Sequence, residues 1–518
     1  MQNKVGLKIA GIAGLTAVLA GGFIASYAFS DLVKNQVKLT FSKPNSYFSW
    51  VCEKNTNDTA AFAAVQAQRL NARNETGQTA NTELCFTPSA EGRDKLKRMI
   101  SDMRLSALDP KIGNMAERII DGTDYLSLEA VSSVSKKASG VNAVLTRNGE
   151  EIFAMDTITA HADELYYVRF PGLTERWLYM ETEDTMPENF RGTAFIRQMP
   201  VIPDPEDAAD RVKKYSDMML EDFSKAAVKR RVPVTIAGLE VKYTEVTANL
   251  NAEQFYDTIS RICEAASKDG VLMDLSGKPE QFSETMGVLA EQFRSGVSSG
   301  RLPDGSVQLK LYVDIAGNIR GIDLSSGAEE NLFCCVGFSG GNIVGTFRCG
   351  DKDTKLADIE LLMTKSNGLY SGTVTGTYGG SEDIYAVDFN NLQLKTEDSV
   401  VLADGSMQIQ KNGEPLSEMT LFSEGNSQSV SCSVEYDEEK LGDITMTYSV
   451  SDGADVEEPD YSDACHFVPS RPETLRNYAD KDSILRFTKQ MLKGIGLTDD
   501  EADRLSDGIS ALLPVSDD

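Results

Sequence analysis

Residues 305–313 read GSVQLKLYV, and this short run decides the class of fold. Val307, Leu309, Leu311 and Val313 are apolar, and most of the residues between them are polar. A period of two places alternate side chains on opposite faces of a β-strand, so that one face is buried and the other is wet. The run therefore predicts an antiparallel strand with one face against a core.

The same alternation recurs towards the C-terminus, where Ile444, Met446, Tyr448 and Val450 share one face. Dipeptides that readily adopt the positive φ angles of two-residue hairpin turns separate such runs. These dipeptides are Asn148-Gly149, Asn367-Gly368, Asp404-Gly405 and Asn412-Gly413. Residues 305–452 are therefore expected to form a long antiparallel meander.

Amphipathic helices are predicted between and around the strands. Asp204-Pro205 is typical of a helix start, and an apolar stripe follows it as far as Ala226. Residues 255–266 and 280–293 show the same spacing. Strands alternating with such helices indicate an α+β layer fold, in which helices cover the buried face of an antiparallel sheet.

Five segments follow from these patterns, with residues 30–120 expected to be helical apart from a polar loop at 71–81. They are a cytoplasmic stub and transmembrane anchor (1–33), a helical N-terminal region (34–122), a first α+β portion (123–304), the meander (305–452), and an acidic linker with C-terminal helices (453–518).

The uncharged run from Ile9 to Ala28 suggests a membrane partner. Twenty residues at about 1.5 Å each would span a bilayer core as one N-terminal transmembrane helix. The run predicts a single-pass anchor with an extracytoplasmic body. A signal peptide cleaved after Ala28, which would release a secreted body, and a buried helix of a soluble protein are the alternatives.

Composition limits the choice of partner. The 518 residues include 51 basic and 79 acidic ones, for a net charge of −28. Such a surface repels phosphate backbones, so no nucleic-acid partner is expected. The length favours two or three domains.

The eight cysteines offer two disulfide candidates. Cys334 and Cys349 flank a predicted hairpin, and they lie opposite each other only if Gly341-Asn342 form the turn. A turn one residue earlier would put them out of register. Cys52 and Cys85, both in the N-terminal region, form the second candidate pair. No C-x-x-C spacing supports a zinc or redox site.

Motifs for catalysis are weak. Residues 337–341 match G-x-S-x-G around Ser339, but a strand follows where the motif needs a helix, so a hairpin turn is the better interpretation. His161 and His466 are isolated and are interpreted as structural. Asp351-Lys352-Asp353 begins like a calcium loop but lacks the later ligands. The sequence predicts no catalytic, metal or cofactor-binding residue, and therefore a protein that is not an enzyme.

Several stretches resemble uncharacterised membrane-anchored exported proteins of Gram-positive bacteria. They are VKLTFSKP (37–44) with NSYFSWV after it, ELYYVRFPGLTERWLYME (164–181), GLEVKYTEVTANLNAEQFYDTI (238–259) and LYVDIAGNIRGIDL (311–324). Such proteins are similar to the LolA-like lipoprotein-carrier fold, a large curved antiparallel sheet cupping helices. The resemblance covers about residues 35–450. It implies a hydrophobic ligand, such as an acyl chain, between sheet and helices, and it transfers no functional residue.

The function expected first is a membrane-anchored, extracytoplasmic, non-catalytic protein that binds a hydrophobic ligand or lipid between sheet and helices. The alternative is a structural or interaction ectodomain that binds an envelope protein or cell-wall partner. An exported hydrolase is a third hypothesis, supported only by the match around Ser339.

Overall fold

The computed structural model describes most of the chain between residues 29 and 512. The described ranges are 29–102, 110–135, 137–160, 165–181, 202–298, 306–326, 330–350, 355–379, 383–397, 400–436, 439–454, 456–468, 474 and 477–512. The chain divides into two compact units. The first contains residues 1–71, 197–390 and 409–415, and the second contains 72–196, 391–408 and 416–518.

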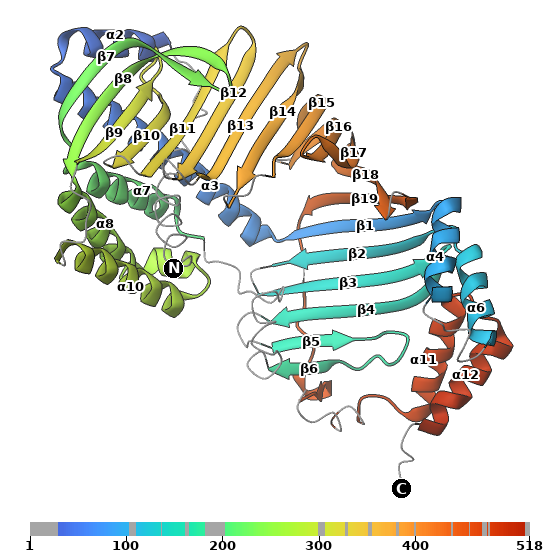
Figure 1. The fold of residues 1–518 in the computed structure, drawn as a ribbon. Helices are drawn as coiled ribbons and strands as arrows, with labels where there is room; N and C mark the ends of the chain where they lie inside the picture. Colours follow the sequence, from blue (N-terminus) through green and yellow to red (C-terminus); the bar gives the residue numbers. More distant parts are fainter. Residues whose placement is uncertain are drawn as a thin grey trace. The chain divides into compact units, whose positions relative to one another are not determined.

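The strands of the described residues form one hydrogen-bonded ladder of twenty (Figure 1). Its order is β7 (Ser224–Ile236), β8 (Leu239–Asn251), β9 (Ser306–Val313), β10 (Ile319–Ser326), β11 (Glu330–Ser339), β12 (Asn342–Gly350), β13 (Lys355–Ser366), β14 (Leu369–Tyr378), β15 (Tyr385–Glu397), β16 (Val400–Lys411), β17 (Glu414–Glu424), β18 (Ser427–Tyr436), β19 (Glu439–Asp452), β1 (Gln78–Pro88), β2 (Leu126–Val134), β3 (Ala138–Arg147), β4 (Glu150–Ala160), β5 (Leu165–Arg169), β6 (Leu178–Glu181) and β20 (Cys465–His466). Neighbouring strands run antiparallel in the pairs whose register is described, except β20 with β6, which is parallel.

The first unit holds the larger core. Its helices are α2 (Phe29–Phe41), α3 (Pro44–Thr76, which runs into the second unit), α7 (Pro205–Leu220), α8 (Ala252–Ala266), α9 (Gly270–Leu275) and α10 (Pro279–Ser298). Apolar residues of α3, α7, α8 and α10 pack on one face of β8, β9 and β10. Val246, Leu311 and Ile322 are opposite one another in the ladder and are all buried there. Alternation along these strands therefore builds a filled core.

A buried polar network attaches α2 and α3 to the β9–β10 turn. Asp314 accepts hydrogen bonds from Arg320 Nε (2.8 Å) and from the backbone N–H groups of Ala316 (2.8 Å) and Asn318 (2.9 Å). Asn35 of α2 donates to the carbonyl oxygen of Asp314 at 3.2 Å, and Tyr47 of α3 donates to Asn35 at 2.8 Å. Because buried polar groups must be paired, this network fixes the position of α2 in the unit.

The second unit contains β1 to β6, β18 to β20, most of β16 and β17, and β15 from Asn391 onwards. Its helices are α4 (Ala90–Asp102), α6 (Pro110–Asp121), α11 (Lys481–Gly494) and α12 (Asp499–Leu512), with a short 3₁₀ turn, η1, at Tyr461–Asp463. The four α-helices gather at one end of the strands β1 to β4 (Figure 1). Its two clusters of fully buried apolar residues are small and lie around β5, β6 and β20.

The fold class predicted from the sequence is wrong. The ladder is not confined to the meander predicted at 305–452, because it also includes β1 to β8 and β20. Within the described ranges, no helix is long and apolar enough to cross a membrane; even the long α3 carries charges such as Glu53, Lys54 and Asp58. The run from Ile9 to Ala28 lies outside the described residues.

Two local predictions were also wrong. Residues 78–88, expected as a polar loop and then helix, form β1, which pairs with β19 more than 350 residues away. The helix at Pro205 ends at Leu220 instead of continuing to Ala226, and β7 starts at Ser224. Local spacing carries no information about such long-range pairing, which here decides the outcome.

Candidate functional site

The two faces of the sheet in the second unit differ sharply in polarity. The hydrogen-bond register places large apolar side chains opposite one another on seven successive strands. We call this set the apolar row. Its members are Leu421, Val430, Met446, Leu84, Leu128, Leu145 and Phe153.

A second row lies two residues further along β1, and therefore on the same face. Phe86 is opposite both Ile444 and Leu126 in this row, and Cys432 and Met419 extend it onto β18 and β17. Together the two rows make a broad apolar surface on the central strands of the unit.

The opposite face of the same strands carries mostly polar side chains, several of them hydrogen-bonded across strands, with Val131 and Phe422 as exposed apolar exceptions. Ser431 lies 3.1 Å from Thr445 and Thr79 lies 3.2 Å from Ser133, each pair joined by a hydroxyl–hydroxyl hydrogen bond. Asn142 donates to Asp156 on the neighbouring strand. These side chains are polar and are hydrogen-bonded across strands, so they do not have to be buried by another part of the protein. This face is therefore a stable outer surface.

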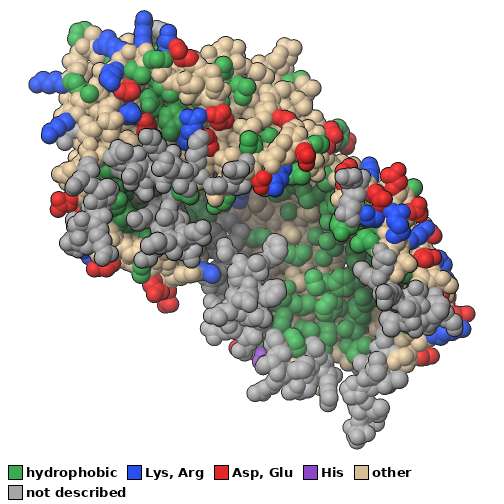
Figure 2. Space-filling view, viewed as in Figure 1, with side chains coloured by type: hydrophobic (Ala, Val, Ile, Leu, Met, Phe, Trp, Pro, Cys, Tyr) green, Lys and Arg blue, Asp and Glu red, His purple; other side chains and the backbone are tan. Residues whose placement is uncertain are grey.

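The apolar row is not buried by the described residues around it. At its centre the exposed fractions are 39% for Leu84, 38% for Leu128 and 36% for Met446. Figure 2 shows hydrophobic side chains gathered over strands β1 to β4 of this unit. The buried clusters of the unit do not include the row. Contiguous exposed apolar surface of this kind typically marks a binding site.

Helices close one end of this face. A Cβ on Gly92 of α4 would lie 1.8 Å from the Leu441 carbonyl oxygen, so α4 packs directly on β19. The buried Arg147, at the end of β3, donates to Thr123 Oγ1 at 2.7 Å just after α6. Gly494 of α11 packs against the backbone of Glu151 in the same way as Gly92. These contacts form a rim along one side of the apolar row, at one end of the strands.

An ion pair joins two of the rim helices. Glu501 of α12 accepts hydrogen bonds from Arg118 of α6 and from the backbone N–H and hydroxyl of Thr498. These contacts, Arg118 first, lower the pKa of Glu501 to about 2. The carboxylate therefore stays ionised at any ordinary pH, and the contact between α6 and α12 does not switch with pH.

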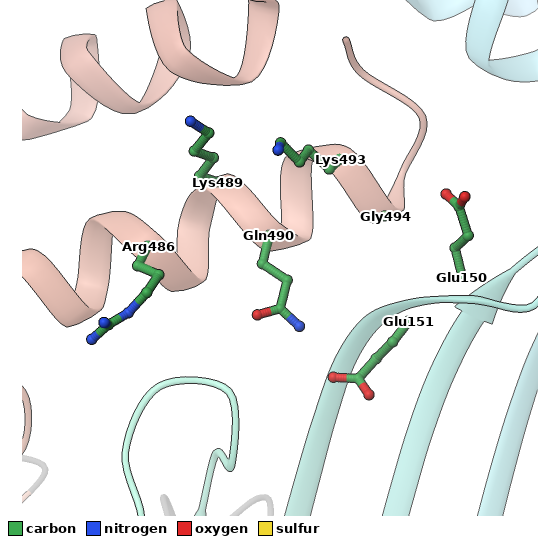
Figure 3. A pocket seen from close by; sticks show the side chains of 7 residues that line it. All are labelled: Glu150, Glu151, Arg486, Lys489, Gln490, Lys493 and Gly494. Atoms are coloured by element: carbon green, nitrogen blue, oxygen red, sulfur yellow. The ribbon is translucent and has the colours of Figure 1, made fainter. Parts of the chain in front are cut away.

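A shallow depression of about 380 Å³ lies between α11 and the start of β4 (Figure 3). Its lysines are already engaged, since Lys489 pairs with Asp503 and Lys493 with Asp499, both on α12. In Figure 3, Gln490 points towards the strand that carries Glu151, whereas the Lys489 side chain points away from it. The depression brings together charged side chains but no nucleophile–base pair, so it offers no catalytic arrangement among its lining residues.

The predicted disulfides are absent. No disulfide joins any two of the eight cysteines, all of which lie in described residues. The β11–β12 turn is formed by Gly340-Gly341, with φ angles of 60° and 87°, one residue earlier than a bridge requires. Cys334 therefore lies opposite Phe347, and Cys349 lies opposite Leu332.

The second predicted pair, Cys52 with Cys85, is also unbonded. Cys52 is buried in the core of the first unit, and Cys85 is on β1 in the second. Burial raises the pKa of the Cys52 thiol to about 12 and that of Cys335 to about 12. Such thiols remain protonated, so neither is a candidate nucleophile.

Of the other residues considered in the sequence, Ser339 and His466 lie in the described ranges and belong to no candidate site. Ser339 ends β11 and is opposite Asn342 across the hairpin, which confirms the turn interpretation of its motif. His466 stacks on Tyr179 with ring centroids 4.6 Å apart. His161 and Asp351-Lys352-Asp353 lie outside the described residues. Among the residues that are described, no group of three His, Cys, Asp or Glu side chains could hold a metal ion.

Sequence reasoning missed the apolar row. A signal for it was present in β1, where Ala80, Leu84 and Phe86 fall at even spacing within an otherwise polar stretch. The strand was interpreted as loop and helix, so its apolar face was not recognised. The matching residues of β2 and β19 became neighbours only through the long-range register.

Comparisons with known proteins do not identify a family. No protein-family model matches the chain, and no curated protein matches it. Among solved structures, Salmonella typhi OmpF in complex with daunomycin is 8% identical in sequence to this chain. The match covers 72% of this chain and 96% of the OmpF chain, with a TM-score of 0.18. The Pseudomonas aeruginosa MucA/MucB complex is 10% identical, with coverage of 76% and 99% and a TM-score of 0.09. Similarity at these TM-scores carries no argument about fold or function.

Proposed function

We propose that the second unit binds a hydrophobic ligand with a long acyl chain along its apolar row. The observation that carries the proposal is the exposure of Leu84, Leu128 and Met446 at the centre of a sheet, where packing would normally bury them.

The dimensions of the row suit an extended chain. Seven strands at a spacing of about 4.8 Å extend over about 29 Å from the first to the last. The row contains no charged or hydrogen-bonding side chain, and its backbone groups are used in the ladder. A ligand on it therefore gains only from apolar contact, which selects a hydrocarbon over a polar or charged molecule.

Side-chain chemistry also supports a ligand of variable shape. Met446 in the first row and Met419 in the second have flexible thioether chains that adapt to different contacts. Covering one row side chain that is about two-fifths exposed contributes roughly 1 kcal/mol. Several such contacts in succession are enough for a useful affinity.

A matched pair of substitutions on β2 tests the site. Leu128 belongs to the apolar row, whereas Val131, 39% exposed, is on the opposite face of the same strand. In the full-length protein, binding of the fluorescent fatty acid cis-parinaric acid should be saturable. Leu128→Gln should weaken it about fivefold, because about 1 kcal/mol of contact is lost. Val131→Gln should leave the affinity unchanged.

The emission of Trp177 checks that the variants remain folded, since this tryptophan lies within the second unit. Equal effects of the two substitutions, or no saturable uptake of the probe, would contradict the proposal. Recovery of a stoichiometric protein partner in place of co-purifying lipid would instead favour the interaction ectodomain.

A further inference from the structure

Helix α2 of the first unit exposes an apolar stripe. Val33 is 50% exposed, Val37 is 51% exposed and Phe41 is 83% exposed. Residues four apart lie on one face of a helix, so the three side chains form a continuous line. On the other side, Asn35 is buried and Leu39 packs on the core. The helix is thus fixed in place with its stripe facing outwards.

Basic residues lie beside this stripe. Lys34 and Lys38 each follow a stripe residue directly, and both are exposed. One residue further on is about 100° around a helix, so the two ammonium groups flank the apolar line. Long lysine side chains in this position can place their charge in a headgroup region while the stripe enters the apolar layer.

Strand β7 adds more positive charge to the same surface. Arg230 Nη2 donates to the Leu39 carbonyl oxygen at 2.8 Å, which joins β7 to α2. Exposed basic side chains run along this strand at Lys225, Lys229, Arg230 and Arg231. Figure 2 shows Lys and Arg side chains at the corner of the first unit where α2 and β7 lie.

The acidic residues nearby do not cancel this charge. Asp31 stands in the first turn of α2, and Glu245 pairs with Lys229 at 3.4 Å. The remaining cations form a basic surface on a chain whose net charge is −28. Like-charged residues gathered against the overall balance indicate a partner of opposite sign.

The position of α2 in the chain points to the same partner. The uncharged run Ile9–Ala28 ends directly before Phe29, the first residue of the helix. Independently of that run, an amphipathic helix with exposed lysines beside an apolar stripe matches the pattern of helices that lie in a membrane interface.

We propose that α2 and β7 form a docking face for an anionic phospholipid bilayer. Val33, Val37 and Phe41 enter the interface, while the lysines and arginines contact lipid phosphates. A nucleic acid would satisfy the charges but would leave the apolar stripe without a partner. The inference is independent of the acyl-chain site in the second unit.

The first experiment reads the depth of one side chain in the bilayer and compares it with the depth of an exposed control position. Phe41→Trp is made in full-length protein that also carries Trp50→Phe and Trp177→Phe. Tyr378→Trp, at an 80% exposed aromatic position on β14, is the matched control in the same background. Vesicles contain phosphatidylcholine and phosphatidylglycerol with brominated acyl chains, which quench an indole only at close range.

The indole introduced at position 41 should be quenched and blue-shifted, and the one at position 378 should not. An indole at position 41 that is not quenched, or equal quenching of the indoles at positions 41 and 378, would overturn the proposal. Circular dichroism of both proteins shows whether the fold has survived.

The second experiment tests the charges. The triple variant combines Lys34→Gln, Lys38→Gln and Arg231→Gln in the position-41 reporter protein. Its binding to phosphatidylglycerol vesicles at low salt should be weaker by about fivefold for each charge removed. The control combines Lys268→Gln, Lys278→Gln and Lys365→Gln, which are exposed elsewhere in the first unit and should have no effect. Equal losses in the two triple variants, or equal binding of wild type to vesicles of phosphatidylcholine alone, would overturn the role of the basic surface.

Discussion

Asp269 shows how a single buried carboxylate links α7 to the start of α9. It accepts hydrogen bonds at 2.9 Å from each of Arg211 Nε, Lys214 Nζ and the Tyr215 hydroxyl. Burial alone would raise its pKa, but these three contacts outweigh burial and lower the pKa from 3.8 to about 2. The charged form is thus bound more tightly in the folded chain than in the unfolded one.

Asp269→Asn should therefore lower the free energy of unfolding by about 2 kcal/mol at pH 7. Because the folded pKa is depressed, this contribution is present above about pH 4 and is lost as the pH falls towards 2. Urea unfolding, followed by Trp50 emission in a Trp177→Phe background, measures the free energy of unfolding of the first unit. Asp210→Asn, at an exposed position of α7, is the control. A difference that stays constant between pH 7 and pH 3 would contradict the assignment.

Asp314 offers a second prediction at this scale. Asp314 and Arg320 are 8% and 3% exposed, so removing the carboxylate takes away a buried charge–charge hydrogen bond of the Arg320 guanidinium. Asp314→Ala should cost about 3 kcal/mol in the same unfolding experiment. Asp358→Ala removes a carboxylate that pairs with Arg348, which is 45% exposed, and should cost less than about 1 kcal/mol. Similar losses for both would argue against a central role for the Asp314 network.

Among the elements, those with local signals were the ones that the sequence predicted. Asn148-Gly149, Asn367-Gly368 and Asn412-Gly413 all adopt positive φ angles at both residues, because asparagine and glycine tolerate that region best. Helices α8 and α10 follow from their apolar spacing. The turn predicted at Asp404-Gly405 was wrong, since both residues lie within β16.

The apolar row could not be predicted in this way. Leu84 faces Met446 and Leu128 only because β1 lies between β19 and β2, a pairing across most of the chain.

Strand β7 was missed for a related reason. Its helical-looking start is overridden by pairing with β8, with irregularities at Lys225 and Arg231, whose φ angles are positive.

The β11–β12 hairpin yields a prediction about covalent structure. With the turn at Gly340-Gly341, Cys334 and Cys349 are not opposite residues, and a bridge would require a shift in register. Full-length protein, denatured without reductant, should therefore titrate eight thiols. Mass spectrometry after alkylation should find both cysteines modified. A count of six, with a peptide linking Cys334 to Cys349, would show that the hairpin has a different register.

At the scale of the whole molecule, the two units differ in how they are stabilised. The first has a large filled core on β8 to β10, whereas the second leaves its apolar row partly open. The second unit is therefore expected to unfold at lower urea concentration than the first, because less apolar surface is removed from water. The location of the body outside the cytoplasm is inferred from sequence alone and stays a prediction.

The two tryptophans make the ligand prediction specific to one unit. Trp50 packs against the core of the first unit, and Trp177 lies beside Tyr167 in the second. A ligand that binds only the folded second unit raises its free energy of unfolding by about 2.7 kcal/mol at a free concentration of 100 times Kd. In a Trp50→Phe variant, a saturating fatty acid should shift the transition reported by Trp177 to higher urea. In a Trp177→Phe variant, the Trp50 transition should not move. Leu128→Gln should reduce the shift of the Trp177 transition. A shift of the Trp50 transition alone would place the ligand in the first unit, because linkage stabilises only the part of the chain that the ligand binds.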